Sequence, residues 1–214
     1  MLKRIHLPRK HSTPFAQVLY RLIKTYSLYI AMILSAETDL FPDSLFEQTR
    51  SDDGRAWWLA HTKPRQEKAL ARDLLDAEFP FFLPCSPVRK RIRNRVVTSY
   101  IPLFSGYAFV RVTPDERPRV YAGNRVARLV PVLDQDRLWS DLDQVHKLLT
   151  LGEPIALEDR LQPGTPVTIR SGPLIGLTGT IVRATAGHKF VVQVNLIQRG
   201  VSVTVDSVSL GKLG

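Results

Sequence analysis

Residues 102–110 read PLFSGYAFV, and residues 164–182 read GTPVTIRSGPLIGLTGTIV. In the first stretch Gly106 precedes an apolar run, which predicts a tight bend that leads into a buried strand. The second stretch is punctuated by glycines between short runs in which apolar residues alternate with others. This alternation with glycine-containing turns predicts short antiparallel strands joined by tight turns. The glycines of the expected barrel turn are Gly172, Gly176 and Gly179.

The sequence around residues 102–110 changes repeatedly between strand and helix patterns. Leu70, Leu74 and Ala77 share one helical face, and apolar residues from Leu138 to Leu149 recur at helical spacing. We expect strands over residues 57–62, 96–101, 107–112 and 126–133, and helices over residues 66–78, 114–121 and 134–151. An order of strand, helix, strands, helix, strand and helix is typical of an α+β sandwich with an antiparallel sheet.

Beyond residue 163 no helical period remains, and period-two alternation predicts a small all-β barrel. The β-branched residues of 180–208 favour a barrel outright, so nothing in the sequence predicts a change of fold there. We expect an N-terminal extension over 1–54 that is flexible or partly helical, an α+β domain over 55–151, a linker over 152–162 and the barrel over 163–214.

The charge of the chain is concentrated in its leader. The formal net charge is +10, but residues 1–31 hold six basic residues and no acid, which leaves 24 basic against 20 acidic residues elsewhere. The leader lacks a convincing transmembrane span or a secretory cleavage site. Two interpretations stay open: a basic amphipathic arm that touches nucleic acid or membrane, or untranslated sequence with Met32 as the true start.

The sequence offers no catalytic or metal-binding constellation. The five histidines are scattered, and no phosphate loop, nucleophile elbow or paired carboxylates are visible. A single cysteine, Cys85, excludes an internal disulfide and fits a reducing compartment, and we expect it to fill the core. We therefore expect no catalytic residue, no metal and no cofactor, and a protein that is not an enzyme.

Three segments carry a family resemblance. Residues 172–179 resemble the KOW motif, with Gly179 at its near-obligatory glycine. Residues 56–68, AWWLAHTKPRQEK, resemble the opening strand and helix of the NGN domain. Residues 102–110 resemble the signature of that domain, with Ser105 in place of the usual proline. Residues 56–214 thus resemble the NusG family of transcription elongation factors, and the leader lies outside the resemblance.

The resemblance implies contact with RNA polymerase through an apolar pocket of the NGN domain. By motif matching this role falls on Phe104, Tyr107 and Phe109, whereas the residues alone allow a second interpretation as core aromatics. The resemblance also implies nucleic-acid contact at a basic hairpin near the upstream DNA fork and at the start of the first helix, where specialised members face non-template DNA. The residues concerned are Lys63, Arg65, Gln66, Arg89, Lys90, Arg91, Arg93 and Arg95.

The family's KOW domain recruits a partner, either a ribosomal small-subunit protein or the Rho helicase. Ser105, the N-terminal extension and residues 194–197 resemble the specialised RfaH type more than the housekeeping factor. The resemblance implies a monomeric, cytoplasmic transcription antitermination factor with no membrane partner. Two alternatives stay open: a KOW-type RNA-binding or ribosome-associated protein, and an enzyme whose site the sequence does not reveal.

Overall fold

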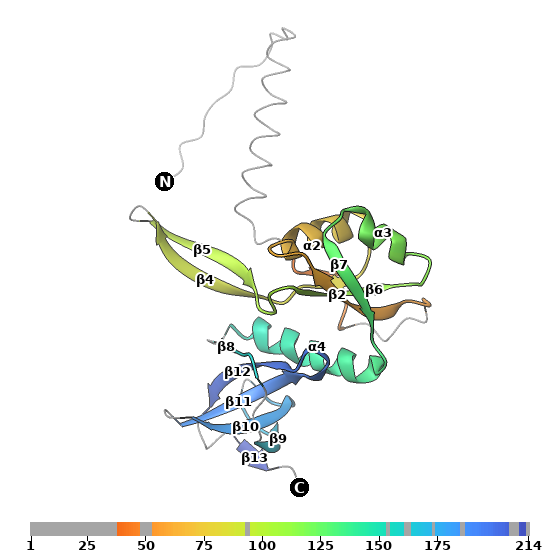
Figure 1. Ribbon diagram of the computed structural model, residues 1–214. Coiled ribbons are helices and arrows are strands. Elements are labelled where there is room, and N and C mark those ends of the chain that lie inside the picture. The colour runs from red at the N-terminus through yellow and green to blue at the C-terminus, as the bar shows by residue number, and fades with distance from the viewer. Residues whose placement is uncertain are drawn as a thin grey trace, which may run out of the picture. The chain divides into compact units, whose positions relative to one another are not determined.

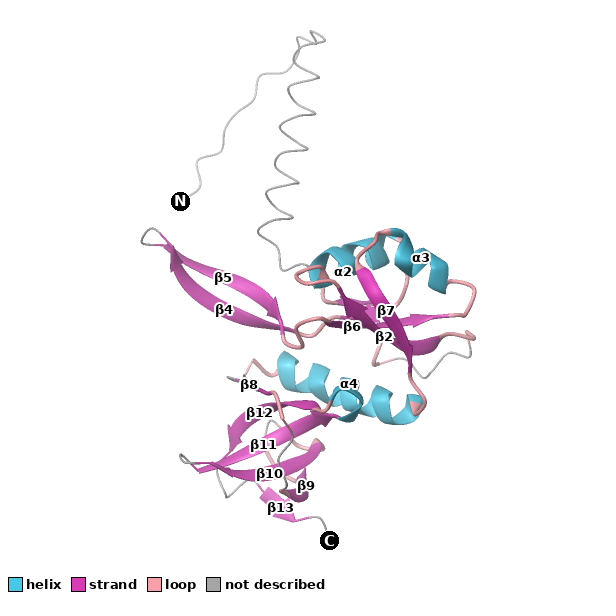
Figure 2. Cartoon of the chain, in the orientation of Figure 1, coloured by secondary structure: helices cyan, strands magenta, loops and turns pink. Residues whose placement is uncertain are grey.

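The computed structural model describes residues 38–47, 53–92, 95–152, 155–160, 164–172, 174–184, 187–205 and 210–212. The basic leader and the alternative start at Met32 lie outside the described residues. No helix in the described ranges is long and apolar enough to cross a lipid bilayer. The order of elements confirms an α+β fold with antiparallel sheets followed by a small β unit (Figures 1 and 2).

A five-stranded antiparallel sheet organises the first part of the fold, in the strand order β1-β3-β6-β2-β7. Its strands are β1 (Leu40–Phe41), β2 (Ala56–Thr62), β3 (Phe81–Phe82), β6 (Tyr107–Val112) and β7 (Val126–Pro131). Three helices flank it: α2 (Glu67–Asp76), α3 (Arg117–Ala122) and α4 (Gln135–Thr150). The three long strands and three helices predicted for this part of the chain are therefore present, with ends that differ from the predicted ones by at most three residues.

The two faces of this sheet bury different residues, because side chains alternate along each strand. Figure 1 shows α2 and α3 on one side and α4 on the other. On the α2 side, Leu70 and Leu74 pack with Ala108 and Val110 of the central strand β6. On the α4 side, Leu142 packs in a second apolar cluster. This cluster includes Trp57, Leu59, Phe82 and Phe109 from the sheet.

Residues 38–47 pack onto the domain and supply a short strand to its sheet, although the sequence predicted a flexible or partly helical lead-in there. β1 pairs antiparallel with β3, joining Leu40 to Phe82 and Phe41 to Phe81. Leu45 is buried, and the Phe46 ring lies 5.3 Å from that of Phe82. The extension therefore contributes an edge strand and an aromatic side chain to the fold.

A two-stranded hairpin leaves the sheet between β3 and β6. It consists of β4 (Cys85–Ile92) and β5 (Arg95–Pro102), paired from Cys85 opposite Pro102 to Ile92 opposite Arg95. Figure 2 shows its strands extending away from the five-stranded sheet. At its base Cys85 is buried and forms no disulfide, as expected for a core cysteine.

The second part is a six-stranded antiparallel sheet in the order β13-β9-β10-β11-β12-β8. Its strands are β8 (Ile155–Glu158), β9 (Thr165–Ile169), β10 (Thr178–Ala184), β11 (Gly187–Val194), β12 (Arg199–Val205) and β13 (Leu210–Lys212), with a 3-10 turn, η1 (Asn195–Ile197). We call this unit the barrel. β8 falls within the segment predicted as a linker, and it pairs with β12, so the barrel's sheet begins before residue 163.

The predicted turn glycines are required by geometry. Gly172 and Gly176 have φ angles of 82° and 86°, in the region that favours glycine. A Cβ on Gly179 would lie 2.5 Å from the carbonyl oxygen of Val191 and 2.8 Å from the Phe190 ring. The turn therefore needs glycine twice for its dihedral angles and once for close packing of neighbouring strands.

Candidate functional site

The loop before β6 is fixed by a buried carboxylate. The backbone N–H of Gly106 donates to Oε1 of Glu67 at 2.7 Å, and the carbonyl of Gly106 accepts from the N–H of Thr62 at 2.9 Å. Glu67 is only 6 % exposed and lies in the first turn of α2, where the helix dipole favours a negative charge. Sequence analysis did not single out Glu67, because its partner lies 39 residues away.

Two of the three predicted docking aromatics are buried. Phe104 is 1 % exposed and Phe109 is 0 % exposed, and their rings meet edge to face with centroids 6.3 Å apart. This is the geometry of the alternative interpretation, in which these residues fill the core. In this conformation neither ring is accessible to a partner.

Tyr107 is the member of the predicted trio that reaches the surface, since it is half-buried. Its ring stacks on that of His61, with centroids 5.2 Å apart and planes at 19°. The register of β2 and β6 places the two residues directly opposite each other. The guanidinium carbon of Arg199 lies 5.6 Å from the Tyr107 ring centroid. Tyr107 is thus in contact with a histidine of the sheet and an arginine of the barrel.

Helix α4 contacts the five-stranded sheet through one set of residues and the barrel through another. Trp139 lies 6.0 Å from Trp57, and His146 lies 5.9 Å from Phe82, by ring centroids. On the barrel side, Asp141 and Gln144 act as hydrogen-bond acceptors. Trp139 and His146 are seven residues apart, about two helical turns, so they lie on one side of α4. Asp141 and Gln144 are three residues apart and share another side.

The polar contacts between α4 and the barrel are short. Oδ2 of Asp141 accepts from the backbone N–H and the side-chain amide of Asn195 at 2.9 and 3.1 Å. Oε1 of Gln144 accepts from the backbone N–H and the hydroxyl of Thr178, both at 2.7 Å. Burial raises the pKa of Asp141, against the opposing effects of the Asn195 hydrogen bonds and of Arg137. Burial therefore makes the charged form of this carboxyl group less favourable than it is in water.

The predicted residues at the start of α2 form a polar cluster with residues from the β7 approach. Nζ of Lys63 donates to Oδ1 of Asn124 at 2.5 Å, and Oε1 of Gln66 accepts from Nη1 of Arg125 at 2.9 Å. Arg65 takes a φ of 60° in the turn that precedes the helix. Asn124 and Arg125 were not predicted, because only folding brings them beside Lys63 and Gln66.

The predicted basic run lies on the hairpin. Arg89, Arg91 and Arg95 are exposed on β4 and β5, Lys90 pairs in register with Val97, and Arg93 lies outside the described residues. Among the described residues, no hydrogen bond or ion pair joins this run to the cluster at the start of α2. The structure thus separates the predicted nucleic-acid residues into two groups.

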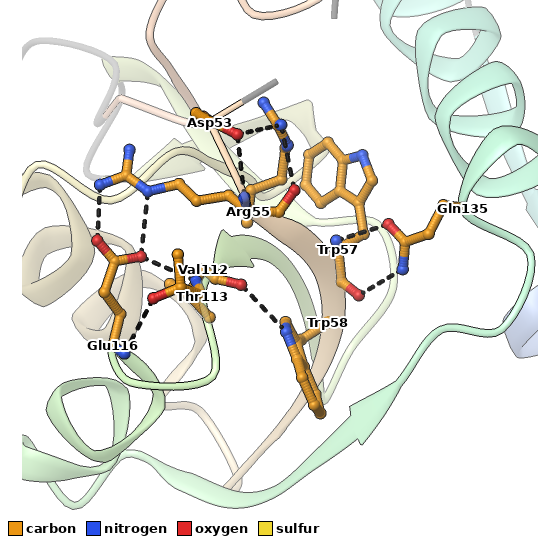
Figure 3. Close-up of polar contacts among 9 residues, drawn as sticks. Asp53, Arg55, Trp57, Trp58, Val112, Thr113, Glu116 and Gln135 are labelled. Atoms are coloured by element: carbon orange, nitrogen blue, oxygen red, sulfur yellow. Dashed lines mark hydrogen bonds and ion pairs between the residues drawn. The ribbon is translucent and has the colours of Figure 1, made fainter. Parts of the chain in front are cut away.

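A polar network on the far end of β2 stabilises the sheet (Figure 3). The guanidinium of Arg55 donates to both carboxylate oxygens of Glu116, at 3.1 and 2.8 Å. This bond lowers the pKa of Glu116. The side chain of Gln135 accepts from the N–H of Trp57 at 2.7 Å and donates to its carbonyl at 3.0 Å. These contacts fix the lead-in to α3 and the start of α4 on the sheet.

The described residues contain no group of three or more His, Cys, Asp or Glu side chains that could hold a metal ion.

Comparison with known proteins gives one family. The family described as "Transcription termination factor nusG" matches residues 55–160, which run from the lead-in of β2 to two residues past the end of β8. Among solved structures, the chain is similar to one of Thermotoga maritima NusG that describes its domain interaction. The sequences are 17 % identical, and the match covers 75 % of this chain and 98 % of that chain with a TM-score of 0.39. No curated protein matches the sequence.

Proposed function

We propose that this chain is a transcription factor of the NusG family, whose model matches residues 55–160, and that it binds RNA polymerase through the sheet face that carries Tyr107. The barrel would then recruit a second component while the first domain is bound. The observation that supports this most directly is the half-buried Tyr107 ring on a loop fixed by Glu67.

The geometry supports a narrower docking role than the sequence predicted. Tyr107 offers an aromatic surface, and tyrosine is enriched among residues that dominate binding interfaces. Phe104 and Phe109 lie behind it in the core, so their part is to hold the loop and strand rigid. A rigid aromatic side chain loses little conformational entropy when a partner covers it.

A partner that takes the Tyr107 ring has to displace Arg199 of the barrel. A cation–π contact contributes roughly 0.5–1 kcal/mol at an exposed site, so this displacement costs little by itself. The polymerase surface that replaces the guanidinium needs an apolar or cationic group of similar size. Release of Arg199 would at the same time free the start of β12 for another partner.

Nucleic-acid contact is the second part of the proposal. The cluster of Lys63, Arg65 and Gln66 would face non-template DNA, and the hairpin arginines would contact phosphates. Neutralised phosphates release counterions, so this part of the binding is expected to weaken steeply with salt. Polymerase docking through an aromatic side chain is expected to depend less on salt.

The barrel is proposed to bind a ribosomal small-subunit protein or the Rho helicase. Exposed apolar side chains near η1, such as Leu196, offer a surface for such a partner. The specialised RfaH-like role stays a prediction that rests on Ser105 and residues 194–197. The expected outcome is processive transcription with less pausing or termination, without catalysis by this chain.

A pull-down of core RNA polymerase by the full chain tests the proposal, with Tyr107→Ala as the variant. We expect the parent to bind and the variant to lose at least tenfold in affinity, because the variant lacks the central ring. Tyr121→Ala is the matched control, since Tyr121 reaches the surface too but belongs to α3 on the opposite side of the sheet, where its hydroxyl accepts a hydrogen bond from the N–H of Leu129. Thermal unfolding of both variants shows whether they are folded.

Loss of binding in Tyr107→Ala alone would support the docking surface. Failure of the parent to bind polymerase, together with affinity for RNA or ribosomes, would replace the proposal with an RNA-binding or ribosome-associated function.

A further inference from the structure

The β4–β5 hairpin presents two different faces, which its register defines. Arg89 pairs with Thr98, Arg91 with Val96, and Pro87 with Tyr100. Directly paired residues lie on the same face of an antiparallel ladder. We call one side the arginine face. It consists of Arg89, Arg91, Val96, Thr98 and Tyr100, all of them exposed.

This face has no acidic neighbour along the chain. Residues 79–114 contain no aspartate or glutamate, and the hairpin itself carries five basic residues. Two arginines spaced two residues apart on one strand lie about 6.7 Å from each other along it. Like charges this close repel each other in the free protein, and a polyanion would relieve that repulsion.

The same face carries an aromatic ring. Tyr100 is 38 % exposed and Val96 is 69 % exposed, although apolar side chains are usually buried in a sheet. Tyr100 lies diagonally across the ladder from Arg89, within reach of a group that contacts both. An exposed ring beside arginines is the combination with which proteins bind unpaired bases: the ring stacks on a base and the cations hold the backbone.

We propose that the arginine face binds single-stranded nucleic acid, with one base stacked on Tyr100 and phosphates held by Arg89 and Arg91. The proposal deepens the nucleic-acid part of the proposed function and rests on it. A duplex keeps its bases stacked on each other, so it could use the arginines but not the ring. The ring therefore distinguishes a single strand from a duplex.

Fluorescence anisotropy of the full chain with oligothymidylate, oligouridylate and a matched DNA duplex tests this. We expect both single strands to bind more tightly than the duplex. Tyr100→Ala should weaken single-strand binding about 5- to 150-fold, which corresponds to the roughly 1–3 kcal/mol of one base stack. Tyr100→Phe should keep most of the affinity, because its ring remains.

The arginine pair is tested by the salt dependence. Changing Arg89 and Arg91 together to alanine should reduce the slope of log affinity against log salt by about 1.4, since each phosphate contact on a single strand contributes about 0.7. Arg128→Ala is the control, because Arg128 is an exposed arginine on β7. It should leave the slope unchanged.

Equal binding of the duplex, or unchanged affinity in Tyr100→Ala, would overturn the proposal. Preference between the DNA and RNA strands identifies the source of the ligand. The polymerase pull-down with Tyr100→Ala separates this inference from the docking proposal. In this variant, retained polymerase binding with lost single-strand binding supports both. Single-strand binding by the parent chain without polymerase binding removes the docking proposal alone.

Discussion

At the scale of single residues, the structure depends on a few carboxylates with defined partners. Glu67 holds the loop before β6, and Glu116 joins Arg55 to the lead-in of α3. Glu116 also forms a reciprocal pair with Thr113: its carboxylate accepts from the Thr113 N–H at 2.9 Å, and its own N–H donates to the Thr113 hydroxyl at 3.3 Å. This reciprocal pairing has the pattern of a capping box, but it closes the turn over residues 113–116, directly before α3 begins at Arg117.

The pair of Arg55 and Glu116 makes folding stability depend on pH. The hydrogen bond from Arg55 lowers the pKa of Glu116 from its ordinary value of 4.5. The stabilisation is therefore complete above that value and is lost as the pH falls through the lowered pKa of the folded state. Glu116→Gln should cost about 1 kcal/mol at neutral pH and almost nothing in strong acid.

Urea unfolding of the wild type and the variant at several pH values checks this prediction. Asp115→Asn, at the exposed neighbouring position, is the control and should show no such difference. A constant difference between wild type and Glu116→Gln at every pH would contradict the ion pair as its cause.

At the scale of elements, long periodic segments were predictable and short ones were not. Strands β2 and β6 have six or seven residues with clear patterns, and α4 repeats its apolar residues over four turns. β1 has two residues, and β8 pairs with a strand more than forty residues away. Neither carries a local signal, so their places were taken for an extension and a linker.

The candidate site shows the same limit. The signature around Tyr107 was visible in the sequence, but the chemistry around that ring comes from tertiary contacts with His61 and Arg199. The burial of Phe104 and Phe109 likewise depends on what packs over them, which the motif does not reveal. Sequence therefore located the loop but not which of its aromatic rings is accessible.

The N-terminal segment provides the prediction at this scale. Phe46 lies 5.3 Å from Phe82, 5.7 Å from Trp139 and 6.4 Å from Trp57, by ring centroids. Phe46→Ala should destabilise the domain by about 2 kcal/mol, less than for a fully buried phenylalanine because Phe46 is only half-buried. Tryptophan fluorescence should shift as well, since two of its neighbours are indoles.

Denaturant unfolding that is followed by fluorescence measures both effects. Glu47→Ala changes an exposed neighbour and should leave stability unchanged. If residues 38–47 were only a flexible lead-in, Phe46→Ala would behave like this control.

At the scale of the whole described chain, α4 contacts both the five-stranded sheet and the barrel. The same helix packs its rings against Trp57 and Phe82 and accepts hydrogen bonds from Asn195 and Thr178. Because the barrel also places Arg199 near Tyr107, its attachment to α4 and the accessibility of that ring are linked. A change in the polar contacts of α4 should therefore alter partner binding at a residue it does not touch.

Asp141→Ala tests this link. The variant leaves the N–H of Asn195 without its acceptor, so hydrogen exchange at that amide should accelerate at least tenfold. The Thr178 amide should follow if the barrel separates from α4 as a unit, although its own acceptor, Gln144, is unchanged. Polymerase affinity should rise, because Arg199 no longer competes for the Tyr107 ring.

Asp143→Ala is the matched control, since it removes only an i,i+4 ion pair with Lys147 on the same helix. Faster exchange at Asn195 alone, with unchanged polymerase binding, would mean that Asp141 holds one turn of the barrel and does not govern access to Tyr107.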